Sequence, residues 1–177
     1  ACGERTWAVA PAQPAAFSAR AIEGMWRALG GTLAGQVRDG RVPAGLQPAF
    51  STTSPALAEV VRDINKYSNN VMTQQVFLTL GLQKGGAGSF EAARDALQRW
   101  WRQRLGGDAD LPVVDNGAGL SREARISAQA LARMLQLAWA APVMPEYLAS
   151  LPIAGVDGTL RRSTSRAAGA AHLKTGS

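Results

Sequence analysis

Two short groups of polar residues in this sequence could take part in chemistry. Ser68 and Asn70 lie two positions apart within Tyr67-Ser68-Asn69-Asn70, where one apolar helical pattern ends and another begins. A serine hydroxyl at that place could relay a proton, and an asparagine amide could hydrogen-bond a substrate amide. A turn that caps a helix uses the same residue types, so this stretch by itself leaves both interpretations open.

The second group is Lys174-Thr175-Gly176-Ser177, in an alternating stretch that predicts the start of a strand. On a strand edge, the Lys174 ammonium and the Thr175 hydroxyl could hold a substrate carboxylate. Gly176 would let a substrate backbone come close, and the N–H of Ser177 could point at a developing oxyanion. Each group is a weak signal alone, but the two together, in this order, are a stronger one.

The residue types give less support to other kinds of chemistry, such as metal binding, acid catalysis or phosphate binding. The chain has one histidine, one cysteine and no carboxylate cluster at ligand spacing, so we expect no metal site and no cofactor. Asp115 is the best single acid, but in Asp115-Asn116-Gly117 we expect it to order its own turn. We interpret His172 as a strand residue, because no acid lies near it in the sequence. The glycine-rich residues 85–88 lack the Gly-Lys-Ser/Thr of a phosphate loop.

Composition indicates a globular protein with a real core. Hydrophobic residues make up 46% of the 177 and charged residues 18%. The net charge of +6 comes mostly from scattered arginines without a groove-reading motif, which argues against nucleic acid as a partner. No apolar run is long enough to span a membrane, and the first residues lack the order of a signal peptide. Cys2 is either an inert thiol or half of a disulfide with a partner upstream.

The elements that must position the polar groups are predicted to be mostly helical. We expect helices over residues 17–29, from Ser54 to the Ser68 turn, over 71–80, 90–105 and 126–140, and one or two further turns in 143–151. Ser54 and Ser89 are expected as N-caps, with Gly30 and Gly81 as C-terminal stops. Short strands are expected at 6–9, at 32–35 paired with 40–43, and at 171–177.

Apolar periodicity also predicts which helix faces are buried. The expected inward residues are Phe90, Ala93, Leu97, Trp100 and Trp101 on one helix and Leu131, Met134, Leu135 and Ala138 on another. Residues 115–121 predict a tight turn that tolerates positive φ.

The sequence segments around both polar groups resemble those of a known family. Ser54 to Asn70, with the sequence SPALAEVVRDINKYSNN, closely resembles a segment of the D-alanyl-D-alanine carboxypeptidase/endopeptidase family. These are the class C low-molecular-mass penicillin-binding proteins, of the penicillin-binding-protein-4 type. Asp115 to Arg122 resembles that family's Asp-Gly-Ser-Gly-Leu-Ser-Arg turn, with an Asn inserted and Ala in place of Ser. Residues 155–160 (GVDGTL) and 173–177 (LKTGS) match as well.

The resemblance implies an α+β fold of the serine β-lactamase/DD-peptidase-like transpeptidase type, in which an antiparallel sheet is flanked by helices and faces a helical lobe. We expect that fold to be incomplete here, with the helical lobe plus the start of the Lys-Thr-Gly strand. Residues 1–16 would be the tail of an upstream segment or inserted domain, and residues 17–177 a partial penicillin-binding (DD-peptidase) domain.

The resemblance also implies an activity, which is acyl transfer on peptidoglycan stem peptides in the periplasm. By resemblance, Ser68, Asn70 and Lys174 are catalytic, and Thr175, Gly176 and Ser177 bind the substrate. β-Lactams would acylate the same nucleophilic serine. The motifs leave carboxypeptidase and endopeptidase activity as alternatives, and they do not indicate an oligomeric state.

One departure from the family pattern decides what this chain could do alone. No serine in the sequence is followed three residues later by lysine, so the nucleophile motif Ser-x-x-Lys is absent. We therefore expect the 177 residues to be inactive by themselves and to belong to a larger enzyme. The alternatives are a β-lactamase, a non-catalytic cell-wall-binding or scaffold protein derived from this fold, and a generic helical domain with chance motifs.

Overall fold

The computed structural model describes residues 13–107 and 110–176, in two compact units. The first unit is Ala1–Thr52 and the second is Thr53–Ser177, a division that the sequence did not indicate. The predicted strand at 6–9 and Cys2 lie outside the described residues.

The first unit is built on one helix. A 3-10 turn, Pro14–Ala16, leads into α1, Phe17–Ala28, and Gly30 follows it at φ 85°, as predicted for a C-terminal stop. The Trp26 indole N–H donates to the Thr32 carbonyl oxygen at 2.9 Å, which folds the chain back on the helix. The predicted strand pair 32–35 and 40–43 is wrong. These residues are largely exposed, and an isolated hairpin without a buried face is marginal in water.

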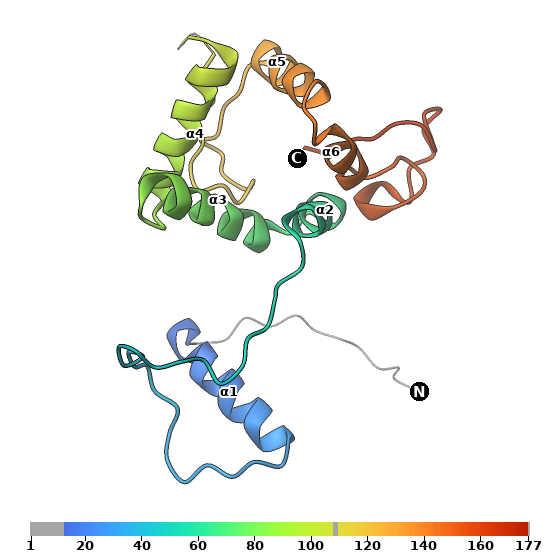
Figure 1. Ribbon diagram of the computed structural model, residues 1–177. Helices are drawn as coiled ribbons and strands as arrows, with labels where there is room; N and C mark the ends of the chain where they lie inside the picture. The colour runs from blue at the N-terminus through green and yellow to red at the C-terminus, as the bar shows by residue number, and fades with distance from the viewer. Residues whose placement is uncertain (1–12, 108–109, 177) are drawn as a thin grey trace, which may run out of the picture. The chain divides into compact units, whose positions relative to one another are not determined.

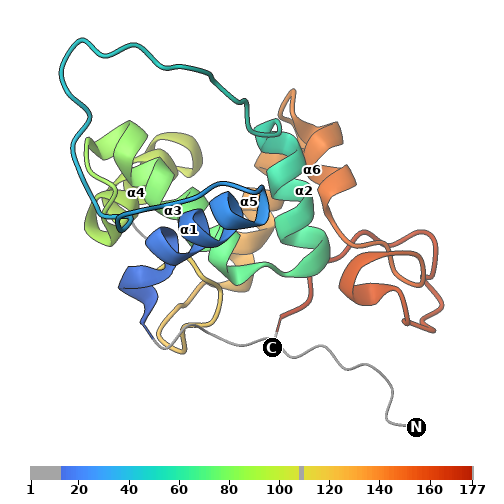
Figure 2. The same ribbon diagram turned by 90° about the horizontal axis from the view of Figure 1, so that it is seen from below.

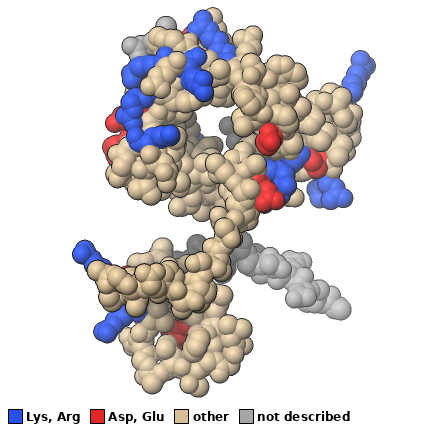
Figure 3. Space-filling view, in the orientation of Figure 1, with Lys and Arg blue, Asp and Glu red and all other residues tan. Residues whose placement is uncertain are grey.

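The second unit carries both polar groups and is mostly helical. Its helices are α2 (Leu57–Tyr67), α3 (Asn70–Gly85), α4 (Phe90–Leu105), α5 (Ala128–Trp139) and α6 (Met144–Ser150), with a short 3-10 turn at Gly158–Leu160. They follow one another around a central opening, which is visible in Figures 1 and 3. The closest packing joins α3 to α4 and α2 to α6.

Two helix boundaries differ from the prediction for physical reasons. Ser54 is not the cap of α2, because the Glu59 carboxylate accepts from the Ala56 N–H at 3.2 Å and starts the helix there. Gly81 does not stop α3, which continues to Gly85. A Cβ at Gly81 would lie 2.8 Å from the Ala93 nitrogen, so this glycine serves the close approach of α3 and α4.

Other predicted helix features are confirmed. Ser89 caps α4, with its hydroxyl accepting from the Ala92 N–H at 3.2 Å, and α6 occupies the expected stretch. Ala93 and Trp101 are buried on α4. Three predicted inward residues, Trp100, Leu131 and Leu135, are instead exposed. Trp100 lines a cavity between α3, α4 and α5, and the two leucines lie on α5, which among the described residues packs appreciably only against α6.

The turn at residues 115–121 packs against two helices. Gly117 and Gly119 adopt φ of 70° and 76°, as expected of a turn that tolerates positive φ. Asp115 does not order this turn through its own side chain. Asn116 does so, since its Oδ1 accepts from the Ala118 N–H at 3.0 Å, while the Asp115 carbonyl oxygen accepts from Arg94.

Replacing Gly117 with alanine should destabilise the protein strongly. A Cβ there would lie 2.5 Å from Cγ of Phe77, which is buried, and alanine disfavours the positive φ. We expect a loss of about 2–4 kcal/mol in the free energy of unfolding. Gly119→Ala is the matched control, because it shares the positive φ but meets nothing within 4 Å. It should cost only about 1–2 kcal/mol. Equal losses for the two variants in urea unfolding would contradict the Phe77 contact.

Strand structure among the described residues is limited to two isolated antiparallel bridges, Val113 with Arg125 and Ile153 with His172. The predicted strand at 171–177 is thus reduced to a bridge at His172, since only residues 152–154 pair with it. A longer strand needs further partners for its N–H and C=O groups.

Candidate active site

Ser68 lies at the junction between α2 and α3. It is the C-cap of α2, and its φ of 54° and ψ of 48° place it in the left-handed region. It is the only non-glycine residue with positive φ among those that the structure describes. The N–H groups of Ser68 and Asn69 both donate to the Ile64 carbonyl oxygen, which ends the helix. A serine in this conformation is strained, and such strain concentrates at functional sites.

Capping of the next helix is carried out by Asn69. Its Oδ1 accepts from the Met72 N–H at 3.1 Å, which satisfies one of the free donors at the start of α3. The capping role and the possible chemical role of this stretch therefore belong to different residues. Asn69 performs the capping, and the Ser68 hydroxyl and the Asn70 amide are not used for it.

The Ser68 hydroxyl instead contacts Lys174. The Lys174 ammonium donates to Ser68 Oγ at 2.6 Å, although the two residues are 106 positions apart in the sequence. An ammonium can only donate, so Ser68 Oγ is the acceptor and its own proton is left to point elsewhere. Both residues are exposed, so a substrate could reach the pair.

The other predicted site residues lie close by in the chain. Asn70 is the first residue of α3 and is half-buried; within residues 13–107 and 110–176 its side chain has no hydrogen-bond partner. Thr175 and Gly176 follow Lys174 and are exposed, and a Cβ at Gly176 would meet nothing within 4 Å. Ser177 lies outside the described residues.

A buried lysine supports the Ser68 end of this arrangement. Lys66 lies in the last turn of α2, and its side chain is only 11% exposed. Its ammonium donates to the Leu151 carbonyl oxygen at 2.7 Å and to Asp157 Oδ2 at 2.6 Å. Nearby, the Asn65 amide donates to Ser150 Oγ at 2.8 Å, and Ser150 is fully buried. The loop that carries Asp157 lies beside α2 in both Figures 1 and 2.

The Lys174 end is held by the same segment. The bridge between Ile153 and His172 is extended by the Leu173 N–H, which donates to the Pro152 carbonyl oxygen at 2.9 Å. His172 Nδ1 lies 3.0 Å from the Leu148 carbonyl oxygen, so this nitrogen carries the hydrogen. His172 thus has a structural position, as expected.

Sequence reasoning missed Lys66 and Asp157 as supporting residues. Both lie in segments that carry the family resemblance, 54–70 and 155–160, so their presence there was the available signal. Their pairing was not visible, because 91 positions separate them.

The pKa of the Asp157 carboxyl lies below its ordinary value of 3.8. The main cause is the hydrogen bond from Lys66, followed by the bond that Asp157 accepts from the Ile153 N–H at 2.8 Å. Both donors favour the ionised carboxylate. Folding is therefore linked to the ionisation of this group.

Lowering the pH should reduce the folding stability of the protein, partly through protonation of Asp157. A depressed folded-state pKa gives stability that is complete above the ordinary value of 3.8 and is lost as pH falls through the folded-state pKa. In urea unfolding, Asp157→Asn should be less stable than wild type at about pH 7, and the difference should shrink toward about pH 2. A constant difference over this range would contradict the linkage.

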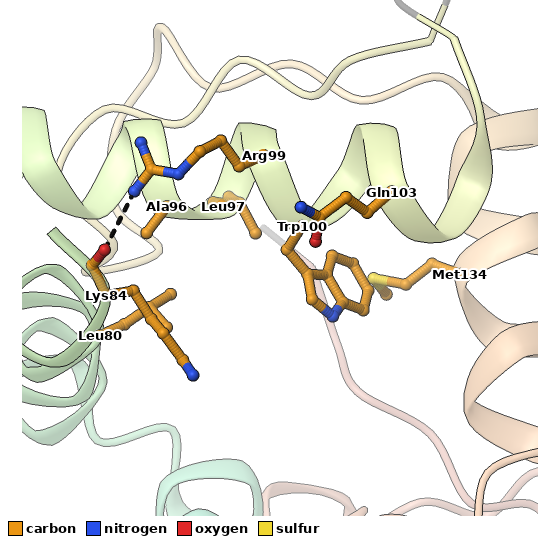
Figure 4. A pocket seen from close by; sticks show the side chains of 8 residues that line it. All are labelled: Leu80, Lys84, Ala96, Leu97, Arg99, Trp100, Gln103 and Met134. Carbon is orange, nitrogen blue, oxygen red and sulfur yellow. Dashed lines mark hydrogen bonds between the residues drawn. The ribbon is translucent and has the colours of Figure 1, made fainter.

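Four cavities among the described residues of the second unit are lined by neither Ser68 nor Lys174. One of about 590 Å³ is lined mainly by apolar side chains of α3, α4 and α5. In Figure 4, Trp100 and Met134 project toward each other across it, while Arg99 donates to the Lys84 carbonyl oxygen at 3.2 Å. Neither Ser68 nor Lys174 lines this cavity.

Two features are absent from the described residues. These residues contain no group of three or more His, Cys, Asp or Glu side chains that could hold a metal ion. None of the described helices is long and apolar enough to cross a membrane.

Comparison with known proteins identifies the family of this chain. The profile of the D-Ala-D-Ala carboxypeptidase 3 (S13) family matches residues 1–177. The chain is 33% identical over 174 residues to a D-alanyl-D-alanine carboxypeptidase of Actinomadura sp. (strain R39). The match covers 93% of this chain and 32% of that protein.

A solved structure shows the same fold. The crystal structure of penicillin-binding protein 4 from Haemophilus influenzae, in complex with a β-lactam, matches with a TM-score of 0.68 at 24% identity. The match covers 87% of this chain and 36% of that one, so the chain spans about a third of the length of its relatives. The predicted fold class and family resemblance are confirmed, and the chain belongs to the D-Ala-D-Ala carboxypeptidase 3 (S13) family.

Proposed function

We propose that the intact protein is a serine-type D-Ala-D-Ala carboxypeptidase or endopeptidase that acts on peptidoglycan stem peptides outside the cytoplasm. The single observation that carries this proposal is the 2.6 Å contact between the Lys174 ammonium and Ser68 Oγ. It joins the two motifs that the family uses for acyl transfer, and family membership supplies the reaction class.

The proposed reaction begins at a serine of a Ser-x-x-Lys motif outside these 177 residues. That serine attacks the carbonyl carbon of the scissile D-Ala peptide bond while its paired lysine takes the proton. As the C–N bond breaks, Ser68 passes its proton to the leaving nitrogen and receives in turn the proton that the paired lysine took, while Asn70 hydrogen-bonds the substrate amide. Water then hydrolyses the acyl-enzyme, and the ester bond to the serine breaks.

The Lys174 end would recognise the substrate. Its ammonium and the Thr175 hydroxyl would bind the terminal carboxylate, and the exposure of both residues leaves room for it. The Ser177 N–H would form part of the oxyanion hole, and Gly176 would let the substrate backbone approach. Because Lys174 donates to Ser68 Oγ, the Ser68 proton is free to face the leaving nitrogen.

The proposal is tested by giving the intact protein a stem peptide ending in D-Ala-D-Ala and, separately, a fluorescent penicillin. We expect release of D-alanine and a long-lived penicillin adduct on a serine outside these 177 residues. Rapid turnover of the penicillin without peptide cleavage would identify a β-lactamase instead. A protein that binds cell wall but forms no adduct would be a non-catalytic scaffold.

A further inference from the structure

We propose that Lys66 and Asp157 are positioning residues that set the location of Ser68 relative to Lys174. Together with the Leu151 carbonyl oxygen they form what we call the Lys66 clamp. This inference rests on the proposed function, because that function gives the Ser68–Lys174 contact its chemical role.

The clamp fixes the Ser68 side through α2. Lys66 lies two residues before Ser68, in the last turn of the helix. Its ammonium is held from two directions, by Leu151 O at 2.7 Å and by Asp157 Oδ2 at 2.6 Å. The end of α2 is therefore tied to residues 151–157 at the point where the chain turns into Ser68.

The same residues fix the Lys174 side. Asp157 uses its second oxygen to accept from the Ile153 N–H at 2.8 Å. Ile153 forms the bridge with His172, and Leu173 donates to Pro152. An unbroken series of short contacts thus leads from Lys66 through Asp157 and Ile153 to the residue before Lys174.

Close packing of the backbone reinforces the clamp. Gly158 follows Asp157 at φ 54°, and a Cβ there would lie 2.6 Å from the Lys66 carbonyl oxygen. Only glycine allows the loop to come this close to the end of α2. Asn65 and Ser150 add a second connection between α2 and the end of α6.

A buried ammonium is a costly way to hold two segments together. Well-packed apolar residues often give equal or greater stability, whereas a paired charge fixes one particular geometry. The exposed pair Arg62–Asp63, on the same helix, differs in that its side chains are 50% and 49% exposed and its atoms are 3.5 Å apart. The burial of the Lys66 side chain and the short distances of the Lys66 clamp therefore favour a role in geometry, which proton transfer at Ser68 would require.

The test measures acylation of the intact protein by fluorescent penicillin. Lys66→Met and Asp157→Asn should each slow acylation by about 10²-fold, as expected when a reacting group moves by about 1 Å. Lys66→Arg and Asp157→Glu should recover at least about a tenth of the wild-type rate, because each restores the charge. Arg62→Met is the matched control and should acylate at the wild-type rate. Folding of each variant is checked by circular dichroism.

Ser68→Ala is measured in parallel to separate this inference from the proposed function. The clamp is contradicted if Lys66→Met and Asp157→Asn acylate at the wild-type rate while Ser68→Ala is slow. A wild-type rate for Ser68→Ala would instead contradict the proposed function. If a single variant does not fold, the double variant K66M/D157N, which leaves no unpaired buried charge, replaces it. Slow acylation by the folded double variant supports the clamp, and a wild-type rate overturns it.

Discussion

Replacing Ser68 with glycine should make the protein more stable and at the same time slow its acylation by about 10²- to 10⁴-fold. The loss of rate follows from removal of the hydroxyl that accepts from Lys174 at 2.6 Å. The gain in stability follows from the backbone, because Ser68 has a φ of 54° and glycine adopts positive φ without strain. We expect a gain of about 1 kcal/mol in the free energy of unfolding.

Two neighbouring variants act as controls for this prediction. Ser68→Ala removes the hydroxyl but keeps the strain, so it should be as slow as Ser68→Gly and less stable. Asn69→Ala removes the cap of α3. It should lose about 1 kcal/mol of stability and acylate at the wild-type rate. A wild-type acylation rate for Ser68→Gly, or acylation that follows stability across the three variants, would contradict a role for the Ser68 hydroxyl.

Replacing Lys174 with methionine should slow acylation by about 10²- to 10³-fold, comparable to the loss of one preorganised donor at a reacting centre. Methionine keeps a similar length and removes the charge that contacts Ser68 Oγ. The variant should also lose its preference for a substrate with a free carboxylate. We would measure kcat/KM for a peptide ending in D-Ala-D-Ala and for its C-terminal amide.

The ratio of the two substrates makes this second prediction specific. Wild type should prefer the free acid, and Lys174→Met should accept acid and amide more nearly equally, because the ammonium no longer binds the carboxylate. Lys84→Met is the control, since Lys84 lies on α3 beside the apolar cavity and away from Ser68. An unchanged acid-to-amide ratio in Lys174→Met would show that Lys174 does not bind the carboxylate.

The sequence predicted the parts of the site that depend on local patterns. Helix periodicity placed Ser68 and Asn70 at a junction of two helices, and the structure has that junction at α2 and α3. Family resemblance linked Ser68 with Lys174, and the structure brings them together. The roles of these residues in catalysis remain predictions that the variants above test.

Features that depend on distant packing were not predictable from local pattern. A glycine such as Gly81 is typical of a helix C-terminus, but in the structure it allows α3 to come close to Ala93 on α4. A lysine such as Lys66 is typical of an exposed helix position. It is buried in the structure because the loop bearing Asp157 packs over the end of α2. Periodicity likewise predicted Trp100 to be buried, yet it is 38% exposed and lines the cavity between α3, α4 and α5.

The most direct test of the central claim is a double-mutant comparison of Ser68→Gly and Lys174→Met in the intact protein. If the two side chains act as one unit in acylation, the double variant should be about as slow as the slower single variant. The measurement is the second-order rate constant for labelling by fluorescent penicillin in wild type and in all three variants. Single variants that label at the wild-type rate, or a double variant whose loss is the full product of the single losses, would contradict a shared role.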